Sequence, residues 1–189
     1  VDADGHFVTQ RTHPAMALIQ TTLEGDVLRL RAPGMGTDIE VPVSDFDADA
    51  APRLRSAVFR SEVQTLVEGP VVNEWLSQYL GQPMRLGRAD PTFRRRCKPR
   101  WEEDREVTTW LPDAYPLLVV SQGSLDALNR RLVARGAQPV GMERFRPNIV
   151  IHDDEIRPHE EDDMARLIGP GYVLQMVAPC ARCPMPNLD

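Results

Sequence analysis

Lysine is almost absent from this chain of 189 residues: Lys98 is the only one among its 22 lysine and arginine residues. A pyridoxal phosphate enzyme needs a lysine that forms a Schiff base with the cofactor. Lys98 lies in the basic run 94–100 (RRRCKPR), a poor place for the desolvated amine that this chemistry requires. We therefore expect no pyridoxal phosphate chemistry within this chain.

Cysteines, apolar runs and excess positive charge are also scarce. Three cysteines are too few for a disulfide scaffold and favour a reducing intracellular compartment, either cytoplasmic or mitochondrial. No run approaches the roughly 20 consecutive apolar residues of a membrane-spanning helix, so we expect no span. The net charge of −6 argues against nucleic acid as the main partner, since binding to phosphates needs a basic face.

The ends of the chain predict a fragment. The first residue is valine, and residues 1–4 (VDAD) have neither the basic nor the apolar region of a signal peptide. The chain opens in what looks like the middle of a strand and stops three residues after Pro186. We therefore expect that both ends are truncated.

The first half of the chain has the pattern of a β-rich protein. Short apolar or alternating stretches at 7–10, 15–19, 26–31 and 39–43 predict strands, and 58–67 predicts one or two more. Turn signals separate them, a spacing typical of a barrel or sandwich. In contrast, residues 71–80 have helical periodicity, with Gly81 as the stop.

Charge and proline dominate residues 90–109, which predicts a long loop and a boundary between domains 1–104 and 105–189. In the second domain we expect strands at 116–120, 148–151 and 173–177. We also expect a helix capped by Ser124, with Leu125, Leu128, Leu132 and Val133 inward, and a helical turn at 162–167. The predicted fold class is mainly β (α+β) with a few short helices.

Two of the three cysteines, Cys180 and Cys183, lie two residues apart near the end of the chain. A thioredoxin-like redox pair is disfavoured, because Pro184 and Pro186 oppose the helix that would lower the thiol pKa. A structural zinc site needs about four ligands, and no second pair of this kind exists. Two thiols without chemistry, packed as small apolar side chains, remain an alternative.

A second candidate pattern lies at residues 142–150 (MERFRPNIV), where Arg146 and Asn148 flank a proline at the start of a predicted strand. An arginine offers a planar fork suited to phosphate, and an asparagine amide both donates and accepts hydrogen bonds. The alternative is an ordinary strand-entry turn with a surface arginine. Residues 113–116 (DAYP) likewise have the pattern of an ordinary turn before a strand.

Taken in order, several stretches resemble the MOSC family, in the two-domain type that includes the amidoxime-reducing components. They are residues 5–11 (GHFVTQR), 14–19 (PAMALI), 121–125 (SQGSL), 145–150 (FRPNIV), 161–163 (EDD) and 179–183 (PCARC). The resemblance covers nearly the whole chain and is weakest at 90–109. It implies a β-barrel MOSC domain that binds the molybdenum cofactor beside a β-rich N-terminal domain.

The resemblance also implies roles for individual residues. Cys183 would be the thiolate ligand of molybdenum, a soft ligand for a soft metal, and Cys180 would be structural. Ala181 stands where a serine is common, so one hydroxyl contact is lost. Asp113 would lie near the cofactor and orient a ligand or substrate. The implied cofactor contacts are Arg146, Asn148, Arg182, Ala181 and Tyr115.

By the same resemblance, the expected function is two-electron reduction of a small N-oxygenated substrate at molybdenum. The electrons would come from a partner protein of the cytochrome b5 or flavin reductase type. The alternatives are a molybdenum cofactor or sulfur carrier without its own redox catalysis, and a degenerate barrel with a binding role. The basic run 94–100 could dock an acidic electron donor, although a solvated loop is the simpler interpretation.

Two departures from the family agree with the expected truncation. A Tyr-Pro-x-Lys-Ser type motif and an Asp-Arg pair before a tryptophan, which help hold the cofactor in the family, are both missing. The strands that normally follow the cysteine motif are missing as well.

Overall fold

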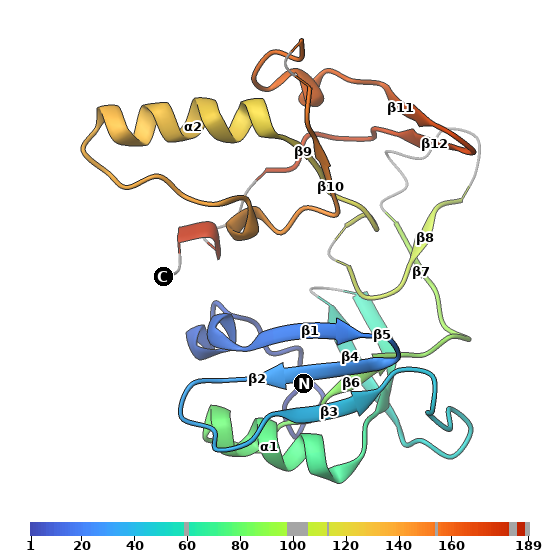
Figure 1. Ribbon diagram of the computed structural model, residues 1–189. Coiled ribbons are helices and arrows are strands. Elements are labelled where there is room, and N and C mark those ends of the chain that lie inside the picture. The colour runs from blue at the N-terminus through green and yellow to red at the C-terminus, as the bar shows by residue number, and fades with distance from the viewer. Residues whose placement is uncertain (59–60, 98–105, 113, 154, 182–184, 188–189) are drawn as a thin grey trace. The chain divides into compact units, whose positions relative to one another are not determined.

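The computed structural model describes residues 1–58, 61–97, 106–112, 114–153, 155–181 and 185–187 (Figure 1). The chain divides into two compact units. The first consists mainly of Val1–Arg96 together with Thr108–Asp113, and the second mainly of Ala114–Asn187 together with Cys97–Val107.

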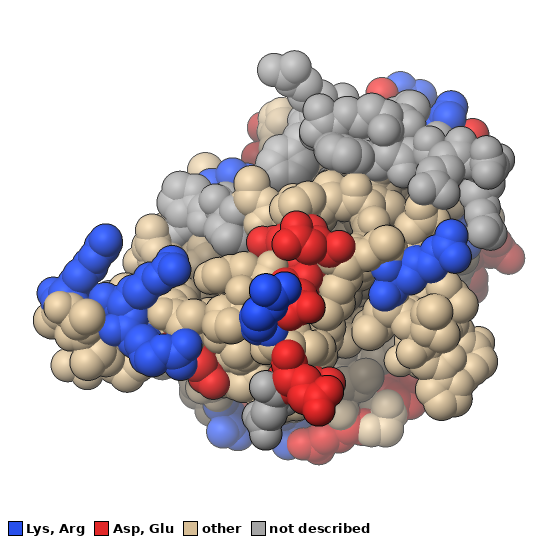
Figure 2. Space-filling view, turned by 90° about the horizontal axis from the view of Figure 1, so that it is seen from above, with Lys and Arg blue, Asp and Glu red and all other residues tan. Residues whose placement is uncertain are grey.

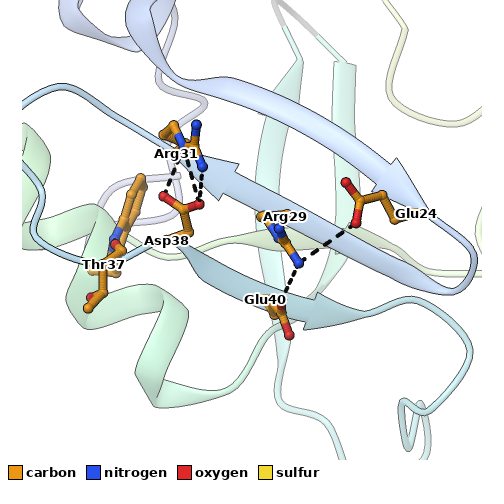
Figure 3. A network of polar contacts seen from close by, with 7 residues as sticks. Glu24, Arg29, Arg31, Thr37, Asp38 and Glu40 are labelled. Atoms are coloured by element: carbon orange, nitrogen blue, oxygen red, sulfur yellow. Dashed lines mark hydrogen bonds and ion pairs between the residues drawn. The ribbon is translucent and has the colours of Figure 1, made fainter.

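An antiparallel sheet of three strands opens the first unit: β1 (Gln20–Glu24), β2 (Val27–Arg31) and β3 (Ile39–Pro42). Alternation along β2 turns Leu30 into the core and leaves arginines on the outer face. There Arg29 pairs with Glu40 at 2.7 Å and with Glu24 at 3.7 Å, as Figure 3 shows. The outer face is therefore held by exposed ion pairs between neighbouring strands.

Helix α1 (Pro70–Leu80) packs its apolar face into the main hydrophobic cluster of this unit. Pro70 occupies its first turn, and Gly81 ends it in the left-handed conformation with φ of 72°. The Trp75 indole donates a hydrogen bond of 2.9 Å to the carbonyl of Thr37, next to β3. The buried members of the cluster are Leu30, Ala32, Val41, Val72, Trp75, Leu76 and Met84.

A second antiparallel sheet holds β4 (Arg53–Val58), β5 (Ser61–Val67) and β6 (Gly87–Ala89), with β5 in the middle. The central strand contains the most buried side chains of this sheet, Val63, Thr65 and Leu66. Two-residue strands β7 (Arg95–Arg96) and β8 (Thr108–Thr109) pair antiparallel, and a 3₁₀ turn, η1, spans Pro14–Leu18. The first unit is thus β-rich with one α-helix among its described residues.

A βαβ element forms the centre of the second unit. Strand β9 (Val119–Ser121) leads into helix α2 (Gln122–Ala134), and β10 (Ile149–Ile151) returns parallel to β9. Strands β11 (Arg166–Gly169) and β12 (Tyr172–Gln175) form a separate antiparallel hairpin. Short 3₁₀ turns complete the unit: η3 (Met142–Phe145), η4 (Glu160–Asp162) and η5 (Met185–Asn187).

The β-rich fold class is confirmed, and the helix predicted at 71–80 is confirmed as α1. Among the described residues the sheets have two or three strands, and none of them closes into a barrel. The strand predicted at 15–19 was wrong: this stretch is the 3₁₀ turn η1, and none of its residues is buried. Residues 7–10 also form no strand. A short apolar stretch forms a strand only where a partner strand pairs with it.

The predicted start and inner face of the second helix also need correction. Ser121, not Ser124, is the N-cap, because its hydroxyl accepts a hydrogen bond from the Ser124 N–H. Val133, predicted to face inward, is 59% exposed. The helical turn predicted at 162–167 lies earlier, at η4, and residues 166–169 form β11 instead.

The surface of the second unit carries charges of both signs. Figure 2 shows acidic and basic side chains interspersed on one face, with basic groups gathered over the C-terminal end of α2. The exposed residues at that end include Arg130, Arg131 and Arg135. In the described part of the chain, no helix combines the length and the apolar character that a membrane crossing requires.

Candidate functional site

The turn that enters β10 contains two of the predicted cofactor contacts. Arg146 follows η3 and adopts the left-handed conformation, with φ of 51° and ψ of 49°. This conformation costs a non-glycine residue about 1–2 kcal/mol. The Arg146 side chain is exposed and has no hydrogen bond or ion pair with other described residues. A strained backbone thus presents an uncompensated guanidinium at the surface of the second unit.

Asn148, two residues later, is bonded to the chain just before β9. Its side-chain Oδ1 accepts a hydrogen bond of 2.9 Å from the Leu118 N–H. In return, the N–H groups of Asn148 and Ile149 both donate to the Leu118 carbonyl, at 2.9 and 3.1 Å. Three hydrogen bonds therefore join the backbone groups of Leu118 to the first residues of the β10 segment.

Another contact ties η3 to the segment that follows the cysteine motif. Arg144 Nη1 donates a hydrogen bond of 3.2 Å to the carbonyl of Pro186 in η5. The two turns pack against each other within the second unit. The structure thereby brings residues that come directly after the motif in sequence close to the turn that precedes Arg146.

The remaining predicted site residues fall into two groups. Tyr115 is half-buried in the bend before β9, and Ala181 is exposed beside the exposed thiol of Cys180. No hydrogen bond between described residues joins Ala181 to Arg146 or Asn148. Asp113, Arg182 and Cys183 lie outside the described residues. The predicted role of Cys183 as the metal ligand therefore stays a prediction.

A buried carboxylate that the sequence did not single out as a site residue lies at the start of α2. Glu161, 8% exposed, accepts hydrogen bonds from the Ser121 N–H at 3.2 Å and the Ser121 hydroxyl at 2.9 Å. Burial raises the pKa of Glu161, but hydrogen bonds from Ser124, from its own backbone and from Ser121 outweigh that effect and lower it. Glu161 thus fixes the loop before β11 to the junction of β9 and α2.

This loop has a second attachment to the same junction. The His159 N–H donates a hydrogen bond of 2.7 Å to the Ser124 hydroxyl, which is itself 2.8 Å from the Ser121 hydroxyl. His159, like Arg146, has a positive φ, in this case 69°. The serine pair in 121–125 (SQGSL), two serines separated by two residues at the end of an apolar run, was the signal that could have revealed this network.

The described residues contain one group whose side chains could together hold a metal ion: Asp2, Asp4 and His6. Asp2 Oδ1 accepts hydrogen bonds from the N–H groups of Asp4 and His6, and Asp2 Oδ2 lies 3.2 Å from His6 Nδ1. The hydrogen bonds of a tight turn account for this arrangement without an ion.

Family models match both halves of the chain. The model of the MOSC N-terminal beta barrel domain matches residues 1–83, and that of the MOSC domain matches residues 106–189. The chain therefore belongs to the MOSC family, in its two-domain form.

Curated relatives narrow the comparison. Mitochondrial amidoxime-reducing component 1 of Xenopus laevis is 31% identical over 195 residues, which cover 100% of this chain and 54% of that protein. Mitochondrial amidoxime reducing component 2 of Rattus norvegicus is 32% identical over 199 residues, which cover 100% of this chain and 55% of that protein. The human component 1 is 30% identical over 194 residues, with coverages of 100% and 54%. The chain thus spans about half the length of these relatives.

A solution structure of a Bordetella bronchiseptica protein aligns with 56% of this chain and 75% of its own, at 23% identity. The TM-score of 0.41 is too low to establish a shared fold.

Proposed function

We propose that this chain forms the cofactor-binding part of a molybdenum-dependent oxidoreductase that reduces N-hydroxylated and other N-oxygenated compounds by two electrons. The observation that carries the proposal is the similarity over 100% of the chain to proteins named amidoxime-reducing components, at 31% identity in the Xenopus laevis case. The order of the two domains supports it, since the MOSC N-terminal and MOSC models match in succession.

The chemistry of the available side chains fits an anionic, sulfur-rich cofactor. Arg146 offers an exposed guanidinium with no acidic partner among the described residues, as a phosphate-binding arginine requires. The amide nitrogen of Asn148 keeps two donors, because only its oxygen is bonded to Leu118. Cysteine thiolates supply the soft ligand that molybdenum would take. These groups come from the second unit, which contains most of the residues matched by the MOSC domain model.

From these properties we propose the following roles. Cys183 supplies the thiolate ligand of the metal, and Asp113 orients the substrate. Arg146 binds the phosphate end of the cofactor by a paired hydrogen bond. Further contacts to the pterin are proposed for Asn148, Arg182, Ala181 and Tyr115.

When bound, the molybdenum cofactor would supply the electrons that convert an N–OH group and two protons into N–H and water. The protein's contribution is to hold the substrate close to a proton donor. Asp113 is the candidate for this proton donor. The electrons would come from a separate protein of the cytochrome b5 or flavin reductase type. By analogy with the relatives, whose names place them in mitochondria, a reducing mitochondrial compartment is the proposed location.

The test measures molybdenum per protein in the wild type and in two cysteine variants. Cys183→Ala is expected to lose most of its molybdenum, because it removes the thiolate proposed as the protein ligand of the metal. Cys180→Ala is the matched control and is expected to retain it. Equal molybdenum content in the wild type and Cys183→Ala would refute the ligand assignment.

Turnover separates the proposal from a carrier role. The wild type, supplied with a chemical electron donor, is expected to reduce an N-hydroxylated amidine to the amidine. A persulfide on Cys183 without any such turnover would instead favour sulfur carriage. The boundary proposed between domains 1–104 and 105–189 can be checked in the same preparation by limited proteolysis.

A further inference from the structure

We propose that Asn148 is a positioning residue, which acts through its side-chain oxygen on the backbone of Leu118. The inference deepens the proposed function and rests on it for the identity of the ligand. By position, Asn148 belongs to the Arg-x-Asn pair that was expected to contact the cofactor directly. Its hydrogen bonds give it a further task, which is to align the segment that precedes β9 with the turn that contains Arg146.

The hydrogen-bonding chemistry of the side-chain amide identifies which of its two polar atoms, the oxygen or the nitrogen, bonds Leu118. A backbone N–H can only donate, so the group 2.9 Å from the Leu118 nitrogen must be the Asn148 oxygen. The NH₂ group of Asn148 therefore points away from Leu118. The side chain is exposed, and its oxygen is the atom with a hydrogen-bond partner among the described residues.

The hydrogen bond between Asn148 and Leu118 lies just beyond the end of the β9–β10 pairing. The parallel pairing of β9 and β10 begins at Val119 and Ile149, so Leu118 lies just before the ladder. Arg146, three residues before Ile149, turns the chain into the left-handed region just before the ladder begins. The Asn148 side-chain oxygen accepts from the Leu118 N–H, as a strand carbonyl would, and so adds one hydrogen bond beyond the end of the ladder.

The consequence for the site is a fixed spacing between two segments. One contains Tyr115 and leads from Asp113 into β9, and the other contains Arg146 and leads into β10. Because Asn148 and Ile149 also donate to the Leu118 carbonyl, both backbone groups of Leu118 are held by the β10 segment. Without the side-chain bond, the two hydrogen bonds to the Leu118 carbonyl would still join the segments, but the Leu118 N–H would lose its acceptor and the spacing between Arg146 and the β9 segment would be less tightly fixed.

Two variants separate positioning from direct contact. Asn148→Asp keeps an acceptor oxygen in the same place and removes the NH₂ donors, whereas Asn148→Gln keeps the donors and displaces the oxygen by one methylene. The readout is hydrogen–deuterium exchange of the Leu118 amide in the purified protein without any added ligand. Exchange in Asn148→Gln is expected to be roughly two- to tenfold faster than in the wild type, the effect of one lost hydrogen bond. Exchange in Asn148→Asp is expected to remain at the wild-type rate.

The matched control is Arg146→Ala, which removes a neighbouring side chain that makes no hydrogen bond among the described residues and should leave Leu118 protected. Molybdenum content is the second readout: positioning predicts that Asn148→Asp retains more metal than Asn148→Gln. Wild-type exchange in Asn148→Gln, or fast exchange in Asn148→Asp, would overturn the inference. If no variant and no wild-type sample binds molybdenum, the proposed function fails, while the exchange rates still decide the role of Asn148.

Discussion

The buried carboxylate of Glu161 provides a direct test of how the second unit is held together. In Glu161→Ala, the Ser121 hydroxyl keeps its neighbour, the Ser124 hydroxyl at 2.8 Å, but the buried Ser121 N–H loses its acceptor. A hydrogen bond to a charged group contributes about 1.5–3 kcal/mol. We therefore expect the free energy of unfolding to fall by about that amount at pH 7.

The pH dependence of this loss follows from the direction of the pKa shift. The pKa of Glu161 lies below its ordinary value of 4.5 in the folded protein. The ionised carboxylate therefore contributes stability that is fully present above pH 4.5 and is lost as the pH falls through the lower folded value. Glu161→Ala lacks this contribution at every pH. The difference between the two proteins should thus be largest near neutrality and should shrink in acid.

Urea denaturation at a series of pH values, followed by circular dichroism, measures both effects. Glu160→Ala is the matched control, because among the residues that the structure describes the Glu160 carboxylate is bonded only to Arg157, in an exposed pair. Its effect should be much smaller and should not depend on Ser121. A Glu161→Ala protein within about 0.5 kcal/mol of the wild type at pH 7, the usual range for a surface change, would refute the reasoning.

Two further predictions concern the core and the Arg146 turn. Leu66 is 0% exposed, so Leu66→Ala is expected to lower the free energy of unfolding by about 2–5 kcal/mol in the same denaturation assay. Leu23, whose side chain is 67% exposed, is the control: Leu23→Ala should change that free energy by less than about 0.5 kcal/mol. Arg146→Gly relieves the strain of a left-handed conformation but adds chain entropy to the unfolded state. Because these two effects oppose each other, its free energy of unfolding should stay within about 1 kcal/mol of the wild type. Its molybdenum content should fall, because the guanidinium proposed to bind the cofactor is removed. Lost stability together with full metal content would contradict the role given to Arg146.

The parts of the fold that could be predicted were those with local signals. Helix α1 has apolar residues at helical spacing, proline at its start and glycine at its end, and each signal acts within a few residues. Strand β2 alternates, and its turns contain glycine. In contrast, η1 was mistaken for a strand because its composition is apolar, while the absence of a pairing partner cannot be seen in the stretch itself.

The same distinction between local signals and distant pairing applies to the candidate site. The turn at Arg146 was recognisable from a short ordered motif, and its residues are adjacent in the chain. Glu161 and Ser121 are 40 residues apart, so no periodicity or spacing rule joins them. The same holds for Asn148 and Leu118, which are 30 residues apart. A sequence indicates which polar groups are present, but the pairing of distant groups is decided by topology.

The Arg-Pro-Asn turn shows what such pairing adds to a motif. Read as a sequence, Arg146 and Asn148 are two similar polar contacts separated by a proline. In the structure they differ in kind: Arg146 has a left-handed backbone and no hydrogen bond or ion pair with another described residue, while Asn148 is bonded to Leu118. Pro147, between them, has no N–H and so adds no backbone donor that would need a partner there. The same short motif thus contains one side chain that secures the start of β10 and one that the proposed function assigns to the cofactor.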